Sequence, residues 1–376
     1  MNKRNIFLLC AIGFLQGMVF YAPVATLYRQ AGGIGIFEIT LIESISLVLS
    51  ILLEIPWGWT ADRIGYRKTM LICCVVFFVS KILFWRASGF GGFLLERILV
   101  AVVCAGLSGV DTGMLFESCR RGDSHRIFGI YGYLQQAGLL LAAIGYSLWI
   151  GSDYRLAGFL TVVSYGIAAL LAFFLQEVKP PEEGRITVRE SVSVLGHQLK
   201  NRKLLMFLIG VALVNETHQT ITVFLNQMQY ARTGMSVEMI SAAYILLSFA
   251  GLASIFSARL AALVGAQRLG RGLILGSFLC CLILAVTGNP VLSVLAVTGL
   301  RMCYGILQPL QLEQQNRRID TKYRATALSM NVVLMDGIAV FLNLLYGSAA
   351  EASLPGSMLL GALFCLVSML LYRRSW

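Results

Sequence analysis

Charged side chains are scarce in this sequence, and their scarcity excludes an ordinary water-soluble domain. Asp, Glu, Lys and Arg make up only 13% of the 376 residues, whereas soluble globular domains carry about a quarter. Apolar residue types make up 57%, and the mean hydropathy is +0.77. This composition indicates an integral membrane protein.

Features that catalysis usually needs are missing as well. The sequence has only 3 His, and no group of His, Cys and Asp has the spacing of metal ligands. No Gly-rich loop is followed by Lys and then Ser or Thr, so the sequence lacks the phosphate-binding motif of an ATPase. The 9 Cys lie mostly in apolar runs, where we interpret them as small packing residues. We therefore expect no enzyme, no cofactor and no metal, and a function driven by gradients.

Long apolar runs fill the chain, and each is long enough to cross a bilayer. Short polar or Gly-containing connections separate these runs, for example at 31–33 and 288–290. The pattern predicts an all-α integral membrane protein with twelve transmembrane helices. We expect them near 5–30, 36–60, 68–87, 92–119, 126–150, 155–176, 203–231, 237–264, 269–287, 290–317, 325–347 and 356–372.

The connection between the sixth and seventh runs differs from the others. It is long and polar, contains Pro180-Pro181, and includes an amphipathic piece near Val188–Gln198 that we expect on the membrane surface. We therefore expect a first six-helix bundle at 1–176, a cytoplasmic linker at 177–203 and a second six-helix bundle at 204–376.

Basic residues are distributed unevenly among the connections. With the N-terminus inside, most of the 30 Lys and Arg residues fall on cytoplasmic segments, and a minority, including Lys81, falls on the outer side. Positive residues favour the cytoplasmic side of a membrane, so both termini are predicted there. The net charge of +11 is thus a topology signal, and we expect no nucleic-acid partner.

The connection after the second run carries a motif. A single acid, Asp62, lies among basic residues and small residues, in the order Gly58, Ala61, Asp62, Arg63, Gly65, Arg67 and Lys68. The spacing resembles the signature between the second and third helices of the major facilitator superfamily of secondary transporters. Thr60 and Tyr66 depart from that signature. The resemblance implies two pseudo-symmetric six-helix bundles that work by alternating access.

The same resemblance implies a gate. Asp62 would face the start of the eleventh helix near Ala325, and Glu117 would take Arg67 as its partner in a charge relay. The gating motif is thus expected at Gly58, Asp62, Arg63, Gly65, Arg67 and Glu117.

Polar residues inside the apolar runs are the candidates for the transport pathway, because such residues usually face a cavity or a partner. In the superfamily the first, fourth, seventh and tenth helices line the cavity. The resemblance therefore places on the pathway Gln16, Tyr21, Arg97, Ser108, Asp111, Asn215, Glu216, Gln219, Asn226, Tyr304, Gln308 and Gln311. The alternative is that these residues only form hydrogen bonds between helices.

For Glu43, Glu54 and Asp336, functional and structural roles both stay open. We interpret His218 as a packing or lipid-edge residue rather than a proton carrier. A structural role and anion binding are equally compatible with Arg97.

Resemblance to a bacterial branch with many drug exporters, at 54–58 and 108–111, favours proton-coupled efflux of a drug-like or natural-product molecule. The alternatives are a proton-coupled importer or a uniporter of a small metabolite and, less favoured, a non-transporting sensor or scaffold. The fifth helix has Gly132, Gly138 and Gly145 but lacks the Pro of the family's antiporter signature. We expect a monomer in the cytoplasmic inner membrane whose partners are a small molecule, a proton or other coupling ion, and lipid.

Overall fold

The computed structural model describes residues 2–119, 124–178, 201–318 and 324–375. Within these ranges, a few side chains are not described, at 55, 58, 59, 62, 124–125, 324–326 and 373–375. The predicted amphipathic piece at Val188–Gln198 lies outside the described residues, and so do the side chains of Gly58, Asp62 and Ala325.

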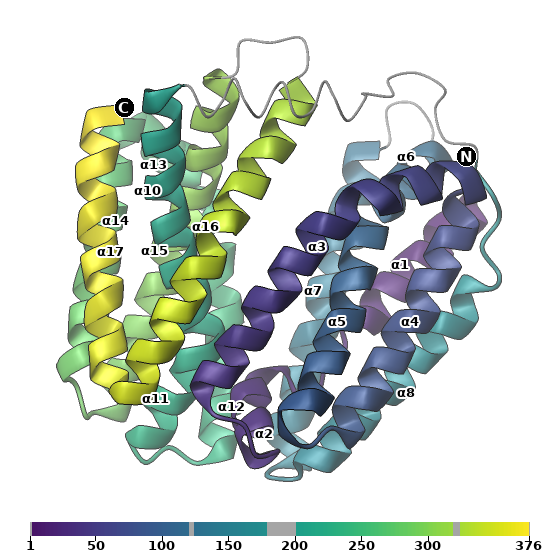
Figure 1. The fold of residues 1–376 in the computed structure, drawn as a ribbon, viewed down its shortest axis with the longest axis horizontal. Coiled ribbons are helices and arrows are strands. Elements are labelled where there is room, and N and C mark those ends of the chain that lie inside the picture. The colour runs from purple at the N-terminus through teal and green to yellow at the C-terminus, as the bar shows by residue number, and fades with distance from the viewer. Residues whose placement is uncertain (1, 120–123, 179–200, 319–323, 376) are drawn as a thin grey trace. The chain divides into compact units, whose positions relative to one another are not determined.

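Every regular element in the described part of the chain is a helix (Figure 1). Twelve helical segments are long and apolar enough to cross a membrane, which confirms the predicted all-α membrane fold. The chain groups into two compact units. The first comprises Met1–Ile34, Ile45–Arg185 and Val237–Ala242, and the second comprises Gly35–Ser44, Ile186–Ser236 and Ala243–Trp376.

The first unit is built from the helices of the first half of the chain. They are α1 (Lys3–Gly17), the 3-10 turn η1 (Ala22–Val24), α2 (Ala25–Ala31), most of α3 (Ile36–Ile64), α4 (Tyr66–Arg86), α5 (Gly89–Leu107), α6 (Val110–Ser118), α7 (Ser124–Gly145), the π-helical turn η2 (Tyr146–Ile150) and α8 (Tyr154–Ala172).

The second unit is built mainly from the helices of the second half. They are α10 (Arg202–Gln219), the π-helical turn η3 (Thr220–Leu225), α11 (Asn226–Arg232), most of α12 (Val237–Ala250), the 3-10 turn η4 (Gly251–Phe256), α13 (Ser257–Val264), α14 (Ala266–Val286), α15 (Pro290–Arg317), α16 (Arg324–Ala352) and α17 (Leu354–Ser375). The start of α3 belongs to this unit.

Several helices begin where the sequence supplies a side-chain cap. The carboxylate of Asp153 accepts a hydrogen bond from the Leu156 N–H at the start of α8, and Asn201 caps α10 in the same way. Asn289 caps α15, and Pro290 follows at the first helical position, where its missing N–H costs nothing. These caps explain why the three helices begin at these residues.

Two predicted spans are interrupted. The first breaks between α1 and α2, where Pro23 cannot donate a backbone hydrogen bond. The fourth breaks at Ser108 and Gly109, and Gly109 has a φ of +79°, a conformation that suits glycine. The helical period of 3.6 residues predicts one continuous stripe with Arg97, Ser108 and Asp111 along the fourth span. This stripe does not form, because Asp111 lies on a different helix from Arg97.

The packing of each unit follows from its apolar faces. In the first unit, Leu9, Ile12, Met70, Met114 and Ala172 join one buried cluster contributed by α1, α4, α6 and α8. Helix α4 packs on α5 and α8, and α1 packs on α7. In the second unit, α17 packs on both α14 and α10, as the yellow and green helices of Figure 1 show.

Candidate substrate and proton pathway

A buried ion pair occupies the first unit. The ammonium of Lys81, on α4, donates to Oε1 of Glu96 on α5 and to the hydroxyl of Tyr21, each at 3.2 Å. Lys81 also lies over the rings of Phe77 and Tyr165, with 5.0 and 5.5 Å to the ring centroids. The charge distribution assigns Lys81 to the outer side of the membrane, and that assignment stays a prediction. The structure adds that Lys81 is buried, because Glu96 and the aromatic rings replace its water.

Asp111 lies in the first turn of α6 and is held by uncharged donors. The Tyr131 hydroxyl donates to Oδ2 at 3.2 Å, and the Thr112 N–H donates to Oδ1 at 2.6 Å. Ser108, at the break before α6, is exposed. Gln16 of α1 donates to Sγ of Cys74 at 3.5 Å. Arg97 is half-buried on α5. The structure therefore brings Asp111 together with Tyr131, which the sequence did not single out.

Glu216 is the buried acid of the second unit. Its side chain is 6% exposed and accepts a 2.8 Å hydrogen bond from the Thr220 hydroxyl. Glu43 and Asp336 lie close enough to act on it electrostatically. In the described part of the chain no cation forms an ion pair with Glu216. Glu216, which the sequence places on the transport pathway, thus lies within electrostatic range of Glu43 and Asp336, whose roles the sequence leaves open.

Helical spacing predicts that Asn215, Gln219 and Asn226 share one polar face of the seventh span, and this face is only partly present. Gln219 is exposed, whereas Asn226 is buried and its Oδ1 accepts from the Gln227 N–H. The π-helical turn η3 lies between them. A π turn holds more residues than an α turn, so the spacing that predicted one face no longer applies beyond Thr220. Asn215 has a buried Oδ1 without a hydrogen-bond partner.

His218 lies in a polar cluster rather than in simple packing. Nη1 of Arg301 is 3.0 Å from its Nε2, and the ring of Tyr304 stacks on the imidazole with centroids 3.8 Å apart. The Thr222 hydroxyl donates to the His218 carbonyl at 2.8 Å. The interpretation of His218 as a packing residue missed these contacts. A basic residue inside the tenth span, Arg301, was the signal that could have found them.

The remaining pathway candidates of the tenth span differ in how far their side chains are buried. Gln308 is exposed, whereas Gln311 is buried and its Nε2 has no hydrogen-bond partner. Tyr304 belongs to the His218 cluster through the stacking of its ring on the imidazole.

An acid that the sequence did not single out, Glu177, follows α8 and contacts the signature connection. The carboxylate of Glu177 accepts from the Arg67 N–H at 3.2 Å, at the start of α4. Gly65 has a φ of +88°, and a Cβ there would lie 2.8 Å from that carboxylate. A negative group is favourable at a helix N-terminus. The guanidinium of Arg67 donates to the Phe173 carbonyl at 3.2 Å. It forms no ion pair with Glu117, which is exposed, so the expected charge relay is not formed in this structure.

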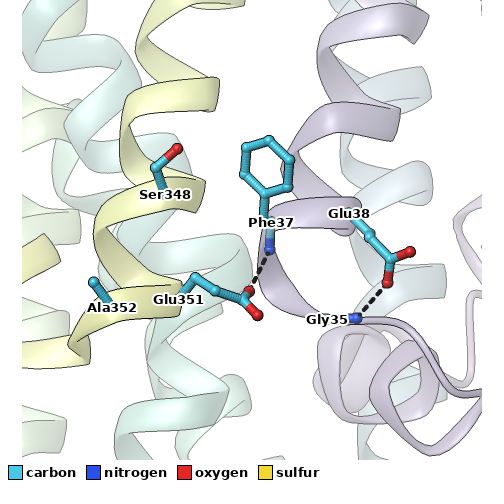
Figure 2. A pocket seen from close by; sticks show the side chains of 6 residues that line it. All are labelled: Gly35, Phe37, Glu38, Ser348, Glu351 and Ala352. Carbon is cyan, nitrogen blue, oxygen red and sulfur yellow. Dashed lines mark hydrogen bonds between the residues drawn. The ribbon is translucent and has the colours of Figure 1, made fainter.

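The start of α3 packs on α16 within the second unit and lines a shallow pocket (Figure 2). The Phe37 N–H donates to Oε2 of Glu351 at 3.2 Å, and the Gly35 N–H donates to Oε2 of Glu38 at 2.8 Å. Two carboxylates thus cap one helix start. A Cβ at Gly347 would overlap the Thr40 side chain, so this glycine permits the close approach.

Comparison with known proteins identifies the family. The Major Facilitator Superfamily model matches residues 6–344. An uncharacterized transporter of Buchnera aphidicola subsp. Baizongia pistaciae (strain Bp) is 26% identical over 146 residues, which cover 38% of this chain and 36% of that relative.

Solved structures show the same fold. The nucleoside transporter NupG superposes with a TM-score of 0.83 at 15% identity, over 100% of this chain and 99% of that one. A D-xylose-proton symporter superposes with a TM-score of 0.75 at 14% identity, over 100% and 98%. The chain belongs to the Major Facilitator Superfamily and is a multi-pass membrane protein.

Proposed function

We propose that this protein moves a small organic molecule across the cytoplasmic membrane by alternating access and couples that movement to a proton. The surroundings of Glu216 carry the proposal. Its side chain is 6% exposed inside a membrane span, and its hydrogen-bond partner is the neutral hydroxyl of Thr220.

The cost of burying charge supports this role. An ionised carboxylate removed from water without a cation is strongly disfavoured, and acids inside membrane spans commonly mark proton relays. Glu43 and Asp336 add further negative potential when they are ionised. Glu216 is therefore protonated while it is sealed and releases its proton when the transport cycle exposes it to water. Asp111, held by Tyr131 in the first unit, is the second candidate for a proton carrier.

The direction of transport is proposed as efflux, from the resemblance at 54–58 and 108–111. Uptake is the second candidate, because the superposed structures include a nucleoside transporter and a D-xylose-proton symporter. Flux into right-side-out and inside-out vesicles distinguishes these directions. An absence of flux for every ligand that binds would favour the sensor or scaffold alternative.

Substrate-driven proton movement in proteoliposomes tests the coupling. A thermal-shift screen against antibiotics, sugars, amino acids and nucleosides first supplies the ligand, because a ligand that binds the folded state raises its apparent stability. We expect Glu216→Gln to equilibrate that ligand across the membrane but to move no protons with it. Glu351→Gln, which removes an exposed carboxyl group, is the matched control and should couple like the parent. If both Glu216→Gln and Asp111→Asn couple as the parent does, neither acid carries the proton.

A further inference from the structure

Arg301 lies within a membrane span and contacts an imidazole that must be neutral. Its Nη1 is 3.0 Å from Nε2 of His218, whose side chain is 2% exposed. A guanidinium can only donate, so Nε2 accepts and the imidazole proton is on Nδ1. The Thr222 hydroxyl donates to the His218 carbonyl at 2.8 Å, and its oxygen also lies 3.3 Å from the same Nε2. The cation therefore has a polar partner that carries no charge.

The other groups around Arg301 do not supply a counter-ion. The phenol of Tyr304 is on the same helix, and the phenol of Tyr244, on α12, lies within electrostatic range. Glu216 accepts from Thr220 instead. Among the described residues no carboxylate forms an ion pair with Arg301. A cation in a span without a counter-ion is strongly disfavoured, and such a residue is usually functional.

The guanidinium keeps donors available. Arg301 is half-buried, and its one hydrogen bond in this structure uses Nη1. Gly251 of η4 borders the opposite edge, where a Cβ would lie 3.1 Å from Nη2 and 3.2 Å from Nε. The Nε–Nη2 edge of an arginine presents two parallel N–H groups, which match the two oxygens of a carboxylate. Gly251 therefore lies beside this edge, and a side chain at position 251 would crowd its two donors.

We propose that Arg301 binds a negatively charged group of the substrate, and that the substrate class is therefore a small organic acid with a carboxylate. This inference rests on the proposed transport function. His218 is a positioning residue, because the contact between its Nε2 and Nη1 holds the guanidinium of Arg301 in place. Binding of the carboxylate supplies the charge that the span itself does not provide.

Matched pairs of acids and amides test the inference on the purified full-length protein. We expect benzoate and nicotinate to raise the apparent melting temperature, and benzamide and nicotinamide to have no effect. Arg301→Gln should weaken acid binding about tenfold to a hundredfold, since a hydrogen bond to a charged group contributes about 1.5–3 kcal/mol. Arg259→Gln, which removes an exposed arginine of α13, is the control and should keep the parent's affinity.

Two further measurements keep the test decisive. If Arg301→Gln does not fold, Gly251→Ala crowds the same donor edge and should also weaken acid binding. An equal effect of acids and amides, or no effect of any acid, overturns the inference. Flux then separates it from the proposed function. Acid binding that depends on Arg301 but gives no flux would leave the binding site standing and refute transport. Proton-coupled flux of a neutral solute that Arg301→Gln does not affect would support transport and overturn the binding site.

Discussion

Nζ of Lys81 lies 3.2 Å from Oε1 of Glu96, and the two side chains are only 7% and 2% exposed. Removing one partner from such a pair leaves a charge without compensation in a dry interior. Replacing both by apolar groups removes the penalty together with the attraction.

This ion pair predicts a specific pattern of stabilities. Glu96→Gln or Lys81→Met alone should lower the free energy of unfolding by about 3–5 kcal/mol. The double variant Lys81→Met/Glu96→Leu should recover much of that loss. Thermal unfolding in detergent measures the three variants, with Arg317→Gln, which breaks an exposed pair with Glu313, as a control of small effect. A double variant that is as unstable as the worse single one would contradict this account.

Two glycines of α7 should respond oppositely to the same substitution. A Cβ at Gly138 would overlap the carbonyl oxygen of Phe14 on α1, whereas nothing lies within 4 Å of a Cβ at Gly132. Gly138→Ala should therefore separate α1 from α7 and destabilise the protein. Gly132→Ala should be neutral or stabilise it by up to about 1 kcal/mol, because alanine favours the helix. Melting temperatures of the two variants compare them directly, and equal shifts would disprove the close-approach role.

A cytoplasmic latch, that is, a contact between Asp62 and the start of the eleventh helix near Ala325, remains a prediction from the sequence. Asp62→Asn should leave expression and detergent stability nearly intact, slow transport, and favour the inward-open state by about 1–3 kcal/mol, the usual size of such couplings. A reporter cysteine at Ser118 should then label faster from the cytoplasmic side. Loss of the variant from the membrane, or normal transport by it, would rule out the latch.

The topology also follows from the sequence alone. A single cysteine near Glu183, in a background without the 9 native Cys, should resist membrane-impermeant thiol reagents in intact cells, because the basic residues of that connection favour the cytoplasm. The same cysteine should label readily in inside-out vesicles. Ready labelling in intact cells would contradict the predicted cytoplasmic location of this connection.

The fold was predictable because its main determinants are local. Apolar runs of bilayer length determine where helices lie, and the motif at Gly58–Lys68 names the family. Interruptions within a span were harder to predict from the sequence, because no residue of the fourth span forbids a helix. Gly109 tolerates both the helical and the left-handed conformation, and its surroundings decide between them.

The candidate site was only partly predictable. Single polar residues such as Glu216 and Tyr304 stand out against an apolar background, whereas their partners depend on which helices pack together. Lys81 reads as an interfacial cation until Glu96 is placed beside it, and His218 reads as packing until Arg301 approaches from α15. The π-helical turn η3 also shifts the faces of the seventh span, and residue spacing does not reveal it.

The break at Ser108 and Gly109 gives the fourth span the mechanics of two rods that share a joint. An unbroken helix bends only by giving up several backbone hydrogen bonds, whereas a jointed one changes angle by rotating a few dihedrals. Asp111 is on the short rod, α6, just past the joint, while Glu96 is on the long rod, α5. A change of dihedrals at Ser108 and Gly109 would therefore move the Asp111 carboxyl relative to the ion pair of Glu96 and Lys81.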